Sequence, residues 1–161
     1  MDSLFHVGGK PFFSIGGQLN NSTSSDPALT EKAFKTCVGL GLNTVAAPVH
    51  WELFEKEEGA YDFAQIDMLM ELARRSGLRL VVLWFGTWKN GNSHYVPEWV
   101  KLQKERFLWA KANDGAEIRA LSPTCEETKK ADMRAFCELC GHIARNNADG
   151  CVIGIQIENE P

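Results

Sequence analysis

The stretch GLRLVVLWF, residues 77 to 85, decides the fold class of this chain. A glycine ends a helical pattern, and an apolar run rich in β-branched residues follows at once, as expected of a strand covered on both faces. The same pattern occurs in GLNTVAAPV, residues 41 to 49, and in GCVIGIQI, residues 150 to 157. This repeated change from helix to strand predicts an α/β fold.

Helical patterns precede these strands. Asp26 and Pro27 predict the N-cap and the first position of one helix. A second helix is predicted over residues 63 to 77, where apolar side chains recur at helical spacing at Ile66, Leu69, Met70 and Ala73. Thr124 and Glu127 predict a capping box at the start of a third helix. The apolar stripe of that helix consists of Phe136, Leu139, Cys140 and Ile143.

One more strand is expected in PFFSIGG, residues 11 to 17, so strands should start near residues 11, 43, 79 and 151. We expect all four to be parallel, because helices alternate with them as in βαβ units. The connection from about residue 85 to residue 123 is long and follows the carboxyl end of a strand, where α/β proteins place their sites. No internal boundary is apparent, so residues 1–161 are predicted to form one unit.

Composition narrows the class of partner. With 44% hydrophobic and 24% charged residues, the chain has the composition of a globular domain and not of a disordered one. The formal charge of -4 comes without a basic run, which argues against nucleic acid, and no apolar stretch is long enough to predict a membrane span. Cys137 and Cys140 form a C-x-x-C inside a helical pattern without a second ligand pair, so no metal or other cofactor is expected.

The last strand ends in an unusual way. Residues 152 to 161 read VIGIQIENEP, so an apolar run finishes in two carboxylates. Glu158 and Glu160 would share a face if the strand continued, because side chains two apart on a strand point the same way. A buried strand ends in charged groups where it reaches solvent or a site. An acidic end in solvent and a catalytic site both remain open from this tripeptide alone.

Aromatic residues gather after the second and third strands. Flat side chains with polar neighbours suit the apolar C–H faces of sugar rings and favour a carbohydrate cleft, although core packing explains any single one of them equally well. The group comprises Trp51, Trp84, Phe85, Trp88, Tyr95 and Trp99.

Three segments together resemble a known family. NTVAAPVHWELFE at 43 to 55, followed by EGAYDF at 58 to 63, resembles the second βα unit of retaining glycosidases built on the (β/α)8 barrel. QIENE at 156 to 160 resembles the fourth-strand motif of glycoside hydrolase family 35 β-galactosidases. LWFGTWKNGNSHYVPEWVK at 83 to 101 is similar to a bacterial branch of that family.

The resemblance implies roles for particular residues. Glu160 is implied as the general acid/base, and Asn159 as a contact of the sugar 2-hydroxyl. Trp51, Trp88 and Asn90 are the further residues that we expect to contact the sugar. Two departures from the usual family pattern, at Pro48 and at residues 84 to 88, leave related β-glycosides open beside β-galactosides.

The resemblance also implies a barrel of eight strands with the nucleophile at the end of the seventh. Since four strands are predicted here, we expect the first four βα units of a (β/α)8 barrel. Such a chain carries the acid/base without the nucleophile, is inactive alone, and pairs with the missing half of the barrel or with a second copy. Two alternatives are a non-catalytic carbohydrate-binding half-barrel and an unrelated nucleotide-binding α/β sheet. The second alternative is disfavoured because no phosphate loop is present.

Overall fold

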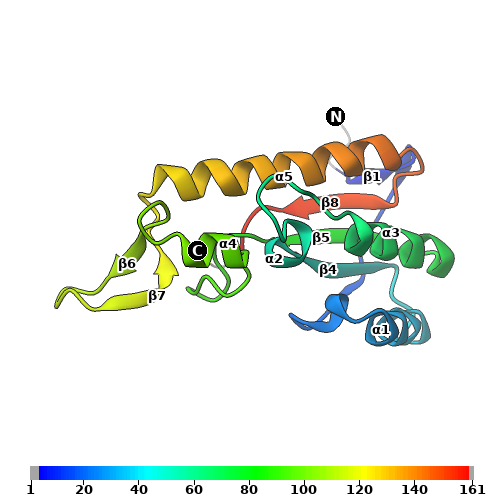
Figure 1. Cartoon of the computed structure of the whole chain (residues 1–161). Helices are drawn as coiled ribbons and strands as arrows, with labels where there is room; N and C mark the ends of the chain where they lie inside the picture. The colour runs from blue at the N-terminus through cyan, green and yellow to red at the C-terminus, as the bar shows by residue number, and fades with distance from the viewer. Residues whose placement is uncertain (1–3, 160–161) are drawn as a thin grey trace.

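The computed structural model describes residues 4–159, which form an α/β structure around a parallel sheet (Figure 1). The sheet has the strand order β3-β4-β5-β8, and each pairing is parallel. Its strands are β3 (Gly16–Gln18), β4 (Thr44–His50), β5 (Arg79–Phe85) and β8 (Val152–Gln156). The prediction of four parallel strands is therefore confirmed.

Three long helices connect these strands: α1 (Pro27–Gly39), α3 (Ala64–Ser76) and α5 (Glu126–Asn146). In Figure 1, α3 lies between the other two, and polar side-chain contacts join it to both. Arg75 of α3 pairs with Glu31 of α1, and His142 of α5 pairs with Asp67 of α3. The helices thus form one continuous layer beside the sheet.

Local signals explain where the helices begin and end. The Asp26 Oδ1 atom accepts hydrogen bonds from the amides of Ala28 and Leu29 at 2.8 and 3.0 Å, so the predicted N-cap of α1 is confirmed. Gly77 ends α3 in the left-handed conformation that glycine adopts without strain. The predicted stripe of α3 is confirmed as well, since all four of its apolar residues are buried.

The predicted capping box of α5 is wrong. The helix begins at Glu126 with Cys125 as its N-cap, and no side chain caps it. The Thr124 hydroxyl instead lies 2.9 Å from that of Ser122. The Thr124 hydroxyl, which was expected to accept from a helix amide, is therefore hydrogen-bonded within the turn before the helix.

The predicted start of the first strand is also wrong. Lys10–Pro11 forms β2, which pairs antiparallel with β1 (His6–Val7), and the parallel strand begins only at Gly16. Between them, Phe13 and Ile15 are 80% and 51% exposed, so no described element covers this apolar run. An apolar pattern predicts a buried strand only where another layer packs on it.

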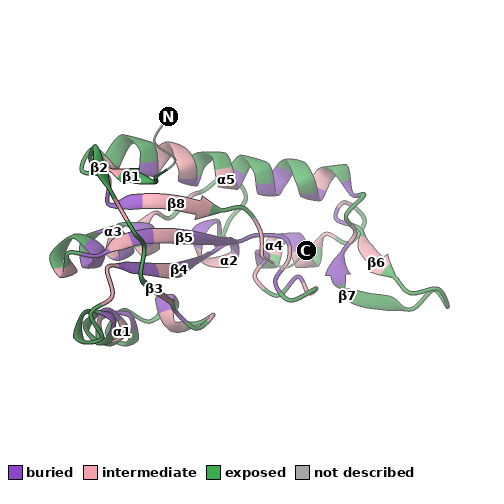
Figure 2. Cartoon of the chain, turned by 180° about the vertical axis from the view of Figure 1, so that it is seen from behind, coloured by how far each residue is buried: buried purple, intermediate pink, exposed green. Residues whose placement is uncertain are grey.

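The centre of the sheet forms the core. Alternate residues of β4 and β5 have no exposed surface, and the buried residues of all three long helices pack against them (Figure 2). Each large apolar side chain that is fully buried contributes about 1.5–3 kcal/mol to folding. The alternating, fully buried residues of these two strands are Val45, Ala47 and Val49 in β4 and Leu80, Val82 and Trp84 in β5.

The remaining short elements follow the carboxyl ends of the strands. After β3 comes the 3-10 helix η1 (Thr23–Ser25), and after β4 comes α2 (Trp51–Phe54). The long connection after β5 contains α4 (Glu98–Leu102) and an antiparallel hairpin of β6 (Trp109–Lys111) and β7 (Glu117–Leu121), which extends away from the sheet in Figure 1. Among the helices of the described part, none has the length and apolar character needed to cross a membrane.

Candidate active site

The carboxyl ends of β5 and β8 meet and bring predicted site residues together. Beyond both strands, an isolated parallel bridge pairs Lys89 with Asn159. Trp88 and Asn90 flank Lys89 in the chain, so three predicted sugar contacts lie at one junction. The predicted acid/base, Glu160, lies outside the described residues.

These residues differ in how they are held. Trp88 is partly buried, and its indole Nε1 donates to the carbonyl of Leu121 at 3.1 Å. Asn90 is exposed and has a positive φ of 53°. The Oδ1 atom of Asn159 is buried and has no hydrogen-bond partner within residues 4–159. A buried acceptor without a partner carries a desolvation cost that a ligand hydroxyl would remove.

Trp51 is not part of this surface. It has no exposed area, its Nε1 donates to Glu55 Oε2 at 2.7 Å, and its ring meets that of Trp99 edge to face. The prediction that Trp51 contacts a sugar is therefore wrong, because the motif around it is built to bury the indole and satisfy its N–H.

Several of the other aromatic residues also belong to the interior. Trp84 and Phe85 are fully buried, and Trp99 donates its N–H to the carbonyl of Glu55 at 2.9 Å. Tyr95 stacks on His50 with a centroid distance of 4.6 Å. Apolar runs on central strands put their aromatic side chains into the core whether or not a site lies nearby.

His50 joins two of the strand ends. Its ring lies 2.7 Å, through Nε2, from the carbonyl of Asn21, and it is almost completely buried. Burial lowers the pKa of His50, and this effect exceeds the opposing effects of the Asn21 carbonyl and of Glu52. The neutral imidazole therefore fixes the loop after β3.

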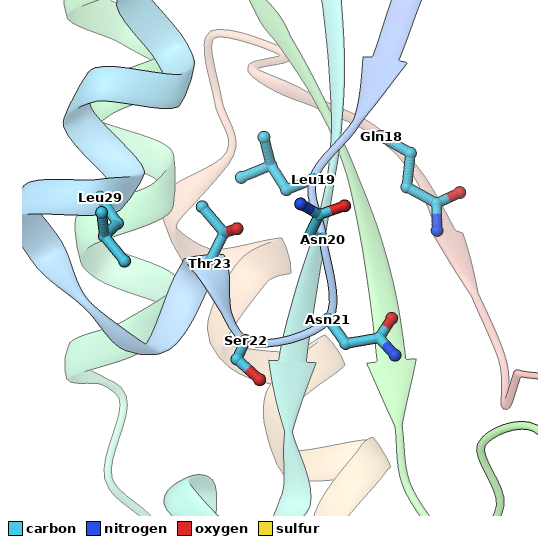
Figure 3. A pocket seen from close by; sticks show the side chains of 7 residues that line it. All are labelled: Gln18, Leu19, Asn20, Asn21, Ser22, Thr23 and Leu29. Carbon is cyan, nitrogen blue, oxygen red and sulfur yellow. The ribbon is translucent and has the colours of Figure 1, made fainter.

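That loop borders a cavity of about 570 Å³ at the carboxyl end of β3 (Figure 3). Figure 3 shows the amide groups of Gln18, at the end of β3, and of Asn20 and Asn21, in the loop. The apolar side chains that line the cavity are Leu19, from the loop, and Leu29, from α1. Amide groups donate and accept hydrogen bonds, which suits a ligand with many hydroxyls. None of these residues was among the site residues predicted from the sequence.

Glu158 does not continue β8. The strand ends at Gln156, and Glu158 has a φ of 58°, which is unusual for a residue with a side chain. Its carboxylate accepts hydrogen bonds from the amides of Thr87 and Trp88, each at 2.9 Å. The expectation that Glu158 shares a face with Glu160 assumed a continuing strand and does not apply.

Asp132 of α5 is a polar residue that the sequence analysis missed. Its Oδ1 accepts from Trp84 Nε1 at 2.7 Å, and its Oδ2 accepts from the amide and hydroxyl of Thr87. Burial first, and then the adjacent Asp132 carboxylate, raise the pKa of Glu158 to about 9. A signal was present in the sequence, because Asp132 lies four residues before Phe136 and so occupies a position on the buried stripe of the helix.

A smaller cavity of about 290 Å³ lies beside this carboxyl pair. Both acids line it together with mostly apolar neighbours. Those neighbours include Trp84, Trp88, Cys125, Met133, Phe136 and Ile157. Within the described residues, no cluster of His, Cys, Asp and Glu is arranged to hold a metal ion.

Comparison with known proteins identifies the family. Residues 4–160 match the model of the glycosyl hydrolases family 35. The chain belongs to this family. It is 28% identical over 140 residues to an exo-beta-D-glucosaminidase of Pyrococcus horikoshii, covering 75% of this chain and 17% of that protein. It is 24% identical over 155 residues to a beta-galactosidase of Xanthomonas manihotis, covering 94% of this chain and 24% of that protein. The chain thus spans less than a quarter of the length of these relatives.

Two solved structures share the fold. The exo-beta-1,4-mannosidase Op5Man5 of Opitutaceae bacterium strain TAV5 matches 99% of this chain with a TM-score of 0.70 and 19% identity. The catalytic domain of a beta-amylase of Paenibacillus polymyxa matches 87% with a TM-score of 0.63 and 21% identity. This chain covers 27% and 35% of those chains, respectively. The predicted fold class, an α/β fold with four parallel strands like part of a (β/α)8 barrel, is confirmed.

Proposed function

We propose that this chain is the part of a retaining β-galactosidase-like glycoside hydrolase that carries the general acid/base, Glu160. The family 35 match and the similarity to a beta-galactosidase support this proposal. The observation that carries it is the pairing of Asn159 with Lys89, which puts the residue before Glu160 at the carboxyl end of the sheet. In barrel enzymes this end holds the active site.

Each residue of the junction has a chemical role in this proposal. Glu160 protonates the glycosidic oxygen as the bond breaks and then removes a proton from the water that attacks the glycosyl-enzyme. Asn159 offers to a sugar hydroxyl its Oδ1, which accepts no hydrogen bond from the described part of the chain. Trp88 and Asn90, on the loop after β5, contact the sugar from beside Asn159.

The retaining mechanism needs a second carboxylate as nucleophile. We propose that residues 1–161 form the N-terminal part of the catalytic barrel and that the nucleophile lies outside them. On this proposal the chain alone does not turn over substrate. Purified chain that hydrolyses an aryl β-D-galactoside, and stops doing so after Glu160→Gln, would contradict it.

The substrate we propose is a terminal, non-reducing β-galactoside of an oligosaccharide or polysaccharide. A second candidate is another β-glycoside, favoured by the similarity to an exo-beta-D-glucosaminidase and by Pro48 and residues 84 to 88, where the sequence departs from the usual family pattern. Rates measured on β-galactoside, β-glucosaminide and β-mannoside substrates with the same leaving group separate the two.

The acid/base assignment is tested with Glu160→Gln in the complete gene product. We expect the rate on a β-galactosyl disaccharide to fall by about 100-fold or more, since general acid catalysis contributes that much. The matched control is Glu57→Gln, because Glu57 is an exposed glutamate in the turn after α2. Unchanged turnover in Glu160→Gln rejects the assignment. Sugar binding measured by calorimetry without any turnover in the wild type favours a non-catalytic binding role.

A further inference from the structure

The carboxyl groups of Asp132 and Glu158 converge on one amide. The backbone nitrogen of Thr87 lies 2.9 Å from Asp132 Oδ2 and 2.9 Å from Glu158 Oε1. Asp132 comes from α5, Thr87 from the loop after β5, and Glu158 from the end of β8. Three elements that are distant in sequence therefore meet at this point.

Ionisation of both carboxyl groups in this pair is energetically unfavourable. Asp132 is buried, Glu158 is partly buried, and both accept from the Thr87 amide. Two carboxylates this close with little access to water share a proton, because their like charges disfavour ionisation of both. Lys129, which lines the same cavity, does not supply the balancing charge here, since it pairs with Glu126 at 2.9 Å.

Hydrogen-bond donors identify which group keeps the proton. Asp132 accepts from three donors, the Trp84 indole and the amide and hydroxyl of Thr87, as expected of an ionised carboxylate. Glu158 accepts from two amides and has Asp132 as its neighbour. The proton therefore belongs on Glu158, where it is donated to Asp132.

We propose that this carboxyl–carboxylate pair clamps the loop after β5 to the end of β8, and that Glu158 is thereby a positioning residue for the acid/base. The clamp fixes Thr87 and Trp88 directly, and the bridge between Lys89 and Asn159 follows immediately. Glu160 is two residues beyond Glu158. This inference rests on the proposed function of Glu160.

The packing around the clamp leaves no room for adjustment. A Cβ atom on Gly86 would lie 2.7 Å from both carboxylate oxygens of Asp132 and would also meet the Trp84 indole nitrogen. The positive φ of Glu158 is a second feature that surrounding contacts must hold in place. The loop is thus built around the acid pair.

Two isosteric substitutions separate the clamp from an ordinary acidic cluster. Glu158→Gln preserves most of it, because its NH2 group still donates to Asp132 and its oxygen still accepts from Trp88. The Thr87 amide loses Glu158 Oε1 as an acceptor but keeps Asp132 Oδ2. Asp132→Asn breaks the clamp, because an NH2 group then faces one of the three donors. In the complete gene product we expect Asp132→Asn to lower kcat/KM on a β-galactosyl disaccharide by about tenfold or more, as small misplacements do. Glu158→Gln should stay within about threefold.

The leaving group shows whether the loss acts through the acid. The leaving group of a dinitrophenyl β-galactoside needs little protonation. The loss of kcat/KM caused by Asp132→Asn should therefore be about tenfold smaller on this substrate than on the disaccharide. Equal losses on both substrates, or equal losses in the two variants, would overturn the proposal. If Asp132→Asn does not fold, Glu158→Ala against Glu158→Gln provides the same comparison. Failure of the proposed function gives a different result from failure of the clamp. If Glu160 is not the acid/base, Glu160→Gln hydrolyses the disaccharide at the wild-type rate.

Discussion

The described residues include two buried pairs in which a tryptophan N–H donates to a carboxylate. The pairs have the same geometry but differ in how far apart their partners lie in the sequence. Trp51 Nε1 donates to Glu55 Oε2 at 2.7 Å, and Trp84 Nε1 donates to Asp132 Oδ1 at 2.7 Å. Four residues separate the first pair in the chain, whereas 48 separate the second.

The difference in sequence separation gives the pairs different roles. Glu55 takes its second hydrogen bond from the Gly59 amide, so it closes one local loop. Asp132 meets Thr87 and a second acid, Glu158, so it joins a helix to two strand ends. The same bond is a local support in one place and part of the proposed site in the other.

Gly86→Ala should have the largest effect on the free energy of unfolding. It disrupts the long-range pair of Trp84 and Asp132 and leaves the local pair of Trp51 and Glu55 intact. The added methyl group would overlap the Asp132 carboxylate and the Trp84 indole, and overpacking of a filled interior costs up to about 3 kcal/mol. Urea unfolding measures the loss. Gly39→Ala is the control, since a Cβ there meets nothing within 4 Å at the end of α1. Equal stability of both variants would show that the packing around Asp132 adjusts freely.

The acid pair also predicts a dependence of stability on pH. The pKa of Glu158 rises from an ordinary value of 4.5 to about 9, so the folded state binds a proton that the unfolded chain releases. The resulting stabilisation is complete below about pH 4.5 and is lost as the pH rises toward about 9. The expected slope is at most about 1.4 kcal/mol per pH unit.

Glu158→Gln isolates this contribution because its side chain does not titrate. Urea unfolding of both proteins across that pH range should give a shallower slope for the variant. Asp132 remains in both proteins, as does Lys129 of α5, the other charged residue that lines the cavity beside the pair. Glu55, whose pKa burial also raises, remains as well. Identical slopes would place the shared proton elsewhere.

The two pairs also show what could be predicted from sequence. The central strands and the stripe of α3 follow from patterns that lie within one element, such as Gly77 and the apolar run after it. The contact of Asp132 with Glu158 depends on the pairing of β8 with β5, which shifts register between Leu80 and Val81. No local pattern encodes that register.

The errors have a related cause. Trp51 and Trp88 look equivalent in the sequence, since both follow strands and have polar neighbours. Their exposure differs because they bind different partners. The Trp51 indole donates to Glu55, four residues away, whereas the Trp88 indole donates to the carbonyl of Leu121 on the hairpin. Sequence spacing predicted that aromatic residues gather near the strand ends, but only packing separates core from site.

Asp132→Asn should destabilise the chain by about 2 kcal/mol. Its carboxylate has three donors, and an amide leaves at least one of them facing an N–H, which costs about 1–3 kcal/mol for a buried group. Thermal unfolding of the variant beside Glu158→Gln measures this. A loss in Glu158→Gln as large as that in Asp132→Asn would reverse the assignment of the proton.

Glu55→Gln should have the smallest effect, about 1 kcal/mol, because only two donors are involved and both lie within one loop. Trp51 or the Gly59 amide loses its acceptor, and the loop relaxes without moving β5 or β8. Hydrogen exchange of the Thr87 and Trp88 amides should therefore stay at the wild-type rate in this variant and rise in Asp132→Asn. Faster exchange at Thr87 in Glu55→Gln would mean that the two buried pairs are coupled, and that the local support also holds the junction of β5 and β8.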